Sequence, residues 1–254
     1  IDGHVYIPDN QLFTNIEKFK KETGMLCLAR PAPLDVPDLD DGLAYWIAVA
    51  RKSFLGHSNG SMIYSSYEGQ CDPVSSGFAY DRSVFEKVGY FDESLDAAED
   101  VEFHHRLKKA GIMAYTSPKL TIYYFPRSTF RDLFRQQERY GEGRARFVQR
   151  HISGLTWETP IPSLLFLFFL FLPGAVSIQE WFPLLSIIYT TTALAYWCIL
   201  LGVGFTESIK RRRFFAGITI AYAIWIIHMG LGWGFLKTIV RPTANRIYAQ
   251  TQEQ

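Results

Sequence analysis

Three groups of polar residues in this chain have the types and spacing that a group-transfer reaction requires. They are the pair Asp2 and His4, the pair Glu99 and Asp100, and the set Gln136, Arg139 and Tyr140. A carboxylate beside an imidazole can bind a divalent cation, a carboxylate can accept a proton, and a guanidinium can bind phosphate oxygens. The chemistry that combines these three functions is transfer of a group from a phosphorylated donor to a hydroxyl.

Asp2 and His4 are separated by one glycine. At the end of an extended strand, residues i and i+2 point to the same side, so both side chains can reach one cation. Mg²⁺ prefers oxygen ligands, whereas Mn²⁺ accepts a nitrogen more readily. An isolated Asp-x-His triplet is also common in turns. These residues alone therefore leave a metal site and a turn as alternatives.

Glu99 and Asp100 begin a predicted helix over residues 99–110, which Gly111 ends. A carboxylate at a helix N-terminus beside a cleft can act as a general base toward an acceptor hydroxyl. Acidic residues in a first helical turn also stabilise the helix dipole, which is the structural alternative. His104 and His105 follow on the same helix, and we expect them to pack or face solvent rather than bind metal.

Gln136, Arg139 and Tyr140 lie in a basic amphipathic segment over residues 127–160. Arg139 has the planar geometry that matches phosphate oxygens, and Tyr140 can stack on a sugar ring or line an acceptor channel. Alternatively, Arg139 is one more cation on a helix that lies on anionic lipid. Binding of nucleic acid is disfavoured, because an adjoining apolar region explains both the charge and the aromatic residues.

Alternating helices and strands precede this segment and predict an α/β layer structure. Helices are expected over 12–23, 43–50, 82–88 and 99–110, and strands over 25–29, 112–115 and 120–125. Residues 55–76 are polar and rich in Gly, Ser and Tyr, which predicts a long loop that is either functional or disordered.

The C-terminal third is apolar, although the whole chain of 254 residues has only 48% hydrophobic residues and a net charge of +1. Three apolar segments cover 164–176, 182–205 and 214–236, and about 20 such residues are needed to span a bilayer. Pro173 and Gly174 interrupt the first, which favours a half-span or re-entrant piece. We therefore predict a membrane region over 161–240 with two to three helices, followed by a tail over 241–254.

The basic residues around these segments give conflicting indications of topology. The loop Lys210 to Arg213 belongs on the cytoplasmic side by the positive-inside rule, as does the soluble domain if the first two segments form a hairpin. The end of the third segment would then be translocated, although Lys237, Arg241 and Arg246 disfavour this. A re-entrant first segment would remove the conflict, and the sequence leaves both arrangements open. The few spans and the absence of intramembrane acids exclude a transporter.

Longer motifs in the chain resemble those of family 2 glycosyltransferases. The run 75–93 (SSGFAYDRSVFEKVGYFDE) is similar to their acceptor-side core, and 98–103 (AEDVEF) is similar to their Glu-Asp catalytic motif. Gln136-x-x-Arg139-Tyr140 resembles their Gln-x-x-Arg-Trp motif. Within the superfamily, succinoglycan-type exopolysaccharide transferases carry an Asp-Gly-His form of the metal motif, as at residues 2–4.

The resemblance implies a partial GT-A (Rossmann-like) fold over residues 1–126 and inverting chemistry. Asp100 would be the base with Glu99 beside it, and Asp2 and His4 would hold Mg²⁺ or Mn²⁺. Gln136, Arg139 and Tyr140 would lie near the donor diphosphate and the acceptor, and Ser75, Ser76 and Gly77 would line the acceptor side. The nucleotide-binding half of such a fold would precede Asp2, so we expect an N-terminally truncated fragment.

The implied reaction moves a sugar from a nucleotide-sugar, expected to be a UDP-sugar, to a polyprenyl-linked saccharide in exopolysaccharide or cell-envelope glycan biosynthesis. We expect a multi-pass inner-membrane protein with a cytoplasmic catalytic domain, in contact with membrane lipid and not with nucleic acid. Tyr140 in place of Trp and the few spans favour addition of a single sugar over polymerisation. Two alternatives are a polyprenyl-phosphate glycosyltransferase, which needs no base, and a non-catalytic scaffold with a degenerate domain.

Overall fold

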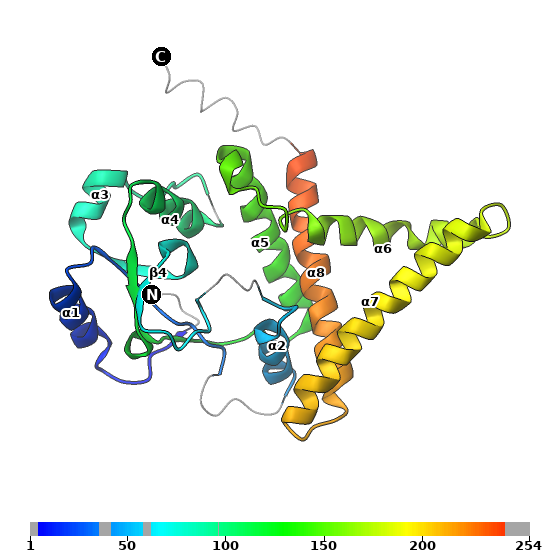
Figure 1. Ribbon diagram of the computed structural model, residues 1–254, viewed down its shortest axis with the longest axis horizontal. Coiled ribbons are helices and arrows are strands. Elements are labelled where there is room, and N and C mark those ends of the chain that lie inside the picture. Colours follow the sequence, from blue (N-terminus) through cyan, green and yellow to red (C-terminus); the bar gives the residue numbers. More distant parts are fainter. Residues whose placement is uncertain (1–4, 36–41, 58–61, 96, 242–254) are drawn as a thin grey trace, which may run out of the picture.

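The structure, a computed structural model, describes residues 5–35, 42–57, 62–95 and 97–241. Its strands are β1 (Val5–Tyr6), β2 (Cys27–Ala29), β3 (Gly69–Cys71), β4 (Gly77–Tyr80), β5 (Ala114–Thr116) and β6 (Tyr123–Tyr124). Its helices are α1 (Leu12–Thr23), α2 (Leu43–Lys52), α3 (Arg82–Val88), α4 (Glu99–Lys109), α5 (Phe130–Arg150), α6 (Ile161–Ser177), α7 (Pro183–Lys210) and α8 (Ala216–Val240). Strands and short helices form the part that carries the predicted catalytic pair, called the catalytic part, and α5 to α8 form a helical part beside it (Figure 1).

The catalytic part is a mixed α/β structure, as predicted. Its main sheet has the strand order β3-β5-β2-β4, in which β2 and β5 are parallel and the other pairs are antiparallel. Successive side chains of a strand point to opposite faces, and Cys27 and Ala29 of β2 accordingly pack in the cluster that holds Phe103 of α4. Leu28 packs on Phe19 of α1 instead. The sheet is therefore covered by α1 on one face and by α3 and α4 on the other.

The predicted long loop over residues 55–76 contains regular structure in its second half. Gly69 to Cys71 form the edge strand β3, which pairs antiparallel with β5, and a 3-10 turn (Pro73–Ser75) follows. A three-residue edge strand is too short to show an alternating apolar pattern. Its pairing with residues 45 positions away is a tertiary contact, which explains why the sequence did not predict it.

The helices α5 and α8 pack side by side with their backbones in close contact. A Cβ atom added to Gly234 of α8 would lie 2.0 Å from the Glu138 carbonyl oxygen of α5. One added to Gly141 of α5 would lie 2.3 Å from the Leu231 carbonyl oxygen of α8. Glycine is therefore required at both positions, as in other closely packed helix pairs with small residues at the interface. Lys237 of α8 also forms an ion pair with Glu138, at 2.6 Å.

The helices α6 and α7 form a hairpin that extends away from the catalytic part (Figure 1). By length and composition, α7 and α8 could each cross a membrane, whereas α6 is an apolar helix of 17 residues. The predicted interruption at Pro173 and Gly174 is not present, because α6 continues through Pro173 to Ser177. Pro173 has no backbone N–H to donate within the helix. In the last turn, the Ser177 hydroxyl donates to the Pro173 carbonyl at 2.8 Å.

Candidate active site

The predicted catalytic pair lies at the start of α4, after a turn with an unusual backbone conformation. Ala98 precedes the helix in the left-handed region, with φ of 64°, and Glu99 and Asp100 are the first two helical residues. Asp100 is exposed, and its Oδ1 accepts a hydrogen bond from the Val101 amide at 2.8 Å. For a residue other than glycine this conformation costs about 1–2 kcal/mol. Such strain persists only where the surroundings fix the conformation.

Helix α5 provides that support at Gly143. A Cβ atom added to Gly143 would lie 2.9 Å from the Ala98 Cβ and 3.0 Å from the Ala97 carbonyl oxygen. The turn that presents Glu99 and Asp100 therefore rests directly on the backbone of α5. Tyr140 is three residues before Gly143 and so lies on the same side of that helix. The catalytic pair and the Gln136-x-x-Arg139-Tyr140 segment consequently occupy neighbouring surfaces.

In α4, the buried His104 forms a polar pair with the half-buried Tyr80, which connects that helix to β4. The Tyr80 hydroxyl of β4 lies 2.6 Å from His104 Nε2 of α4. Burial lowers the pKa of His104 to about 4, so the ring is neutral at pH 7. Burial also raises the pKa of the Tyr80 phenol, with further contributions from the nearby Cys27 and Asp100 groups. Asp100 is thus close enough to the β4–α4 contact for its charge to raise the pKa of the Tyr80 phenol.

The predicted acceptor-side residues Ser75, Ser76 and Gly77 precede Tyr80 in the chain, and Gly77 lies against His104. Gly77 is the first residue of β4, and a Cβ atom at this position would lie 2.8 Å from His104 Nε2, so a side chain has no room. Ser76 Oγ is buried and has no hydrogen-bond partner within the described residues. The Ser76 carbonyl accepts from the Arg30 amide at 3.0 Å. Ser75 ends the preceding 3-10 turn, and its side chain lies outside the described part.

The Gln136-x-x-Arg139-Tyr140 segment meets the end of α2. Arg51 of α2 donates from Nη1 to the Gln136 side-chain oxygen at 3.3 Å. Tyr140 is 47% exposed. The pKa of the Tyr64 phenol is raised, chiefly by burial, and the Tyr140 phenol contributes further while Arg51 opposes. Tyr64 and Arg51 therefore lie near Gln136 and Tyr140 of α5, and Arg139, three residues after Gln136, is exposed.

A second contact fixes the C-terminal end of α5 to α4. Glu102 is only 4% exposed and accepts from Arg106 Nε at 3.0 Å with each carboxylate oxygen. His151 Nε2, just after α5, lies 3.1 Å from Glu102 Oε1. Arg150 pairs with Asp92 in the loop after α3. The start of α4 is thus fixed to α5 at two places, by Gly143 at the Ala98 turn and by His151 at Glu102.

Sequence reasoning did not predict roles for Arg51, Tyr80, Glu102 or His151. The pair Glu102 and Arg106 has the i, i+4 spacing of a helical ion pair, which is a signal that the sequence does contain. By contrast, Arg51 and Gln136 are 85 positions apart, and Glu102 and His151 are 49 apart. No local pattern marks those two contacts.

The predicted metal ligands Asp2 and His4 lie outside the described residues. Within the described ranges, no three His, Cys, Asp or Glu side chains are grouped closely enough to hold a metal ion. The two residues immediately precede β1, which pairs antiparallel with β6 through Val5 and Tyr124. An oxygen and a nitrogen ligand from Asp2 and His4 would suit Mn²⁺ or Mg²⁺ shared with a phosphate.

Comparison with known proteins identifies the class of enzyme. The family model described as "Glycosyl transferase family group 2" matches residues 40–237. The chain is 29% identical over 160 residues to "Succinoglycan biosynthesis protein ExoA" of Rhizobium meliloti (strain 1021), covering 62% of this chain and 45% of that protein.

A second relative is archaeal and acts on a lipid-linked sugar by its name. It is a "Dolichyl N-acetyl-alpha-D-glucosaminyl phosphate 3-beta-D-2,3-diacetamido-2,3-dideoxy-beta-D-glucuronosyltransferase" of Methanococcus voltae. The two sequences are 23% identical over 203 residues, which cover 80% of this chain and 53% of that protein. The chain thus spans about half the length of the curated relatives it matches. No solved structure matches it.

Proposed function

The chain belongs to glycosyl transferase family group 2 and is a glycosyltransferase, and we propose that it adds one sugar from a nucleotide-sugar to a polyprenyl-linked saccharide with inversion. The family implies a GT-A fold, a sugar donor with an acceptor, and typically a divalent cation. The observation that carries the proposal is the position of Asp100. Its exposed carboxylate lies in the first turn of helix α4, directly after the Ala98 turn that α5 supports. The segment proposed to bind the donor diphosphate lies on the same helix α5.

In the proposed reaction, Asp100 accepts the proton of an acceptor hydroxyl while that oxygen attacks the anomeric carbon of the donor. The bond from this carbon to the diphosphate oxygen breaks, and the nucleoside diphosphate leaves. General-base catalysis of this kind contributes roughly 10²- to 10⁴-fold in rate. Glu99, partly buried beside Asp100, is proposed to act as the second carboxylate of the catalytic pair.

The donor side of the proposed site is formed by α5 and α2. Arg139 and Gln136 are proposed to contact the diphosphate, and Arg51 orients the Gln136 amide through their hydrogen bond. Tyr140 would stack against a sugar ring at the boundary with the acceptor. A divalent cation held by Asp2 and His4 would neutralise charge on the leaving diphosphate. Ser75, Ser76 and Gly77 would line the acceptor side of the site.

The proposed setting is the cytoplasmic face of an inner membrane. Residues 161–240 would anchor the protein, 127–160 would lie at the lipid surface, 1–126 would form the catalytic half, and 241–254 would be a tail. The long apolar helices α7 and α8 support the anchoring. Exopolysaccharide or cell-envelope glycan synthesis is supported by the succinoglycan relative. A lipid-linked saccharide as acceptor is supported by the printed name of the archaeal relative.

The proposal is tested with the full-length protein in membranes, supplied with a panel of nucleotide-sugars, Mn²⁺ or Mg²⁺, and a lipid extract. We expect release of one nucleoside diphosphate, UDP, with incorporation of its sugar into a lipid-linked saccharide and loss of both signals in EDTA. Glu86→Gln, which changes an exposed acid on α3, serves as the matched control for Asp100→Asn. If the product is instead a polyprenyl phosphate that carries a single sugar, and Asp100→Asn forms it as fast as the wild type, the proposal is overturned in favour of a polyprenyl-phosphate transferase.

A further inference from the structure

Helix α8 is long and apolar enough to cross a membrane, but α5 and α2 cover one of its sides. Near its start, Tyr222 contacts Phe130 of α5, with ring centroids 4.9 Å apart. Near its end, the Thr238 carbonyl accepts from Gln149 of α5 at 3.4 Å. The two helices therefore run parallel from one end to the other, in line with the backbone contacts at Gly230 and Gly234 between these points.

The helix α2 covers α8 as well. Trp46, Ile47 and Ala50 of α2 share a buried cluster with Ile220, Ile224 and Ile227 of α8. His228 of α8 lies 2.9 Å from the Leu55 carbonyl, just beyond α2, through Nε2. Together with further contacts from α6 and α7, such as Trp197 with Trp225, these contacts bury 56% of the most apolar window of α8 within the protein, compared with 17% of the corresponding window of α7. Most of the surface that α8 could offer to lipid is already occupied.

The partner helix α5 is incompatible with the interior of a bilayer. It carries arginines on several sides, namely Arg131, Arg135, Arg139, Arg144, Arg146 and Arg150. An arginine at the centre of a membrane costs at least about 2.5 kcal/mol, so this helix must remain outside the hydrocarbon core. Because α5 is in contact with α8 along its length, α8 cannot cross the bilayer while α5 stays at its surface.

The hairpin of α6 and α7 has the opposite character. Between residues 161 and 206 the only charged residue is Glu180, at the connection between the two helices. Phe168 of α6 stacks on Tyr189 of α7, with ring centroids 4.9 Å apart, and this contact joins the two arms. At about 1.5 Å per residue, the 17 residues of α6 extend roughly 25 Å, close to the thickness of the hydrocarbon core of about 30 Å.

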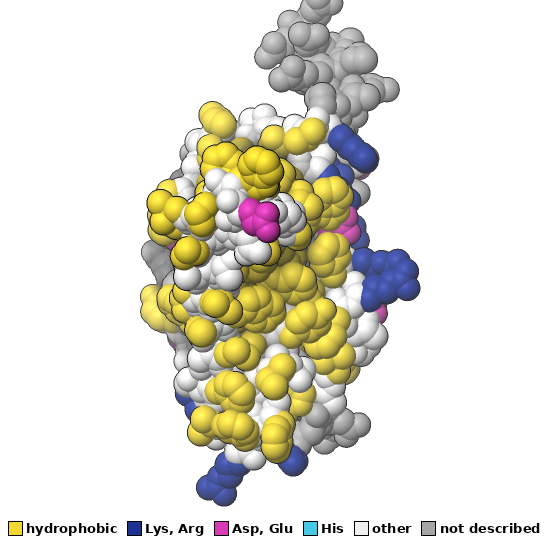
Figure 2. All heavy atoms as spheres, turned by 90° about the vertical axis from the view of Figure 1, so that its right-hand side faces the viewer, with side chains coloured by type: hydrophobic (Ala, Val, Ile, Leu, Met, Phe, Trp, Pro, Cys, Tyr) yellow, Lys and Arg dark blue, Asp and Glu magenta, His cyan; other side chains and the backbone are white. Residues whose placement is uncertain are grey.

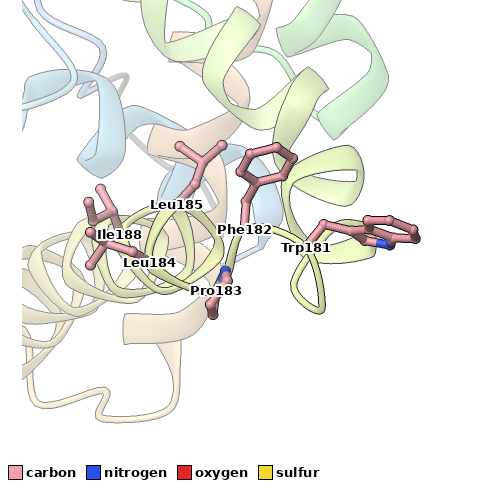
Figure 3. Close-up of a pocket in the computed structure, with 6 residues that line it drawn as sticks. All are labelled: Trp181, Phe182, Pro183, Leu184, Leu185 and Ile188. Carbon is pink, nitrogen blue, oxygen red and sulfur yellow. The ribbon is translucent and has the colours of Figure 1, made fainter.

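The tip of the hairpin exposes large apolar side chains. Trp181 is 79% exposed and Phe182 is 60% exposed. Figure 3 shows both at the turn into α7, where they line an apolar hollow with Pro183, Leu184, Leu185 and Ile188. Seen from this side, the molecule presents a broad hydrophobic face with Lys and Arg at its edge (Figure 2). This distribution suits contact with a bilayer, because the apolar side chains would meet the hydrocarbon core and the Lys and Arg side chains would meet anionic headgroups.

We propose that the α6–α7 hairpin is the membrane-inserted element of the described chain and that α8 lies along the surface of the bilayer on the catalytic side. In this arrangement α6 crosses the hydrocarbon core and α7 crosses back, so the tip of the hairpin lies on the side of the membrane opposite to the catalytic part. The basic loop 210–213 and Arg241 at the end of α8 then lie on the same side. This arrangement removes the conflict between the basic residues and the positive-inside rule.

The inference rests on the membrane association proposed above, and it is tested by labelling with a membrane-impermeant maleimide in sealed, inside-out vesicles. Single cysteines are introduced into the full-length protein as Glu86→Cys on α3, Gln179→Cys at the tip, Arg212→Cys and Arg241→Cys. Cys198, exposed on α7, is replaced by Ala in all of them. Cys27 and Cys71 stay, because burial raises their pKa to about 12 and about 11 and keeps the thiols unreactive.

We expect residues 86, 212 and 241 to be labelled from the same side, and residue 179 to react only after the membrane is opened with detergent. Labelling of 212 and 241 from opposite sides would show that α8 spans the membrane and would overturn the inference. Labelling of 179 together with 86 in intact vesicles would also overturn it, because the hairpin would not be inserted. The labelling pattern does not depend on sugar turnover, so failure of the topology and failure of the proposed reaction are distinguishable.

Discussion

The contact between Gly143 and the catalytic turn leads to a quantitative prediction for Gly143→Ala. The added Cβ would lie 2.9 Å from the Ala98 Cβ and about as close to Ala97, so one backbone must move by several tenths of an ångström. We expect the turn to move rather than the backbone of α5, because Ala98 is already in a strained conformation. Asp100 would move with the turn. A misplacement of about 1 Å costs roughly 10²-fold in rate, so a shift of half that size predicts roughly a tenfold loss, or about 1.4 kcal/mol.

The assay compares kcat and the unfolding temperature of the variant with those of the wild type and of Gly202→Ala. Gly202 lies within α7 with no atom within 4 Å of an added Cβ, so it controls for the gain in helix propensity of about 1 kcal/mol. We expect kcat to fall in Gly143→Ala alone, with donor KM within about twofold and cooperative unfolding retained. A kcat equal to that of wild type in a folded Gly143→Ala protein would refute the reasoning that α5 positions the catalytic turn.

Three further predictions follow from the contacts around the site. Arg51→Ala should raise the donor KM roughly fivefold, because Gln136 loses its partner, and Arg51→Lys should restore part of the loss in initial-rate measurements. Glu102→Gln should lower the free energy of unfolding by about 3 kcal/mol in a denaturant titration, since Arg106 loses a buried counter-ion. Between pH 6.5 and 4, wild-type unfolding free energy should fall more than that of His104→Gln, by up to about 3 kcal/mol.

The results that would contradict these predictions are equally specific. An unchanged donor KM in Arg51→Ala would show that Gln136 needs no orientation from α2. Equal stability of Glu102→Gln and wild type would show that the buried carboxylate is neutral or replaceable. The sign of the pH effect follows from the lowered pKa of His104. The neutral ring is favoured in the folded state, so its contribution is complete above pH 6.5 and is lost as the pH falls through about 4.

Elements with local signals could be predicted from the sequence. Gly24 ends α1 at φ 66° and Gly111 follows α4 at φ 71°, as expected for left-handed residues after a helix. Asp81 caps α3 by accepting from the Ser83 amide, another signal contained within three residues. The family was predicted from motifs of similarly short range, and the match over residues 40–237 confirms it.

Features that depend on contacts between distant segments could not be predicted in this way. No local sequence pattern indicates that Gly143 supports Ala98, because the contact joins the interior of a helix to a turn 45 positions earlier. The continuation of α6 through Pro173 likewise contradicts the usual local effect of proline. The roles of Asp2, His4, Asp100 and Arg139 stay predictions.

The most direct test of the proposed reaction is the rate of sugar transfer by Asp100→Asn at saturating donor and acceptor, with donor binding measured in parallel. Asparagine has nearly the same shape as aspartate but cannot accept the proton. We predict a fall in kcat of roughly 10²-fold or more with unchanged donor affinity, while Glu86→Gln retains full activity. Transfer by Asp100→Asn within about threefold of the wild-type rate would contradict the assignment of Asp100 as the general base.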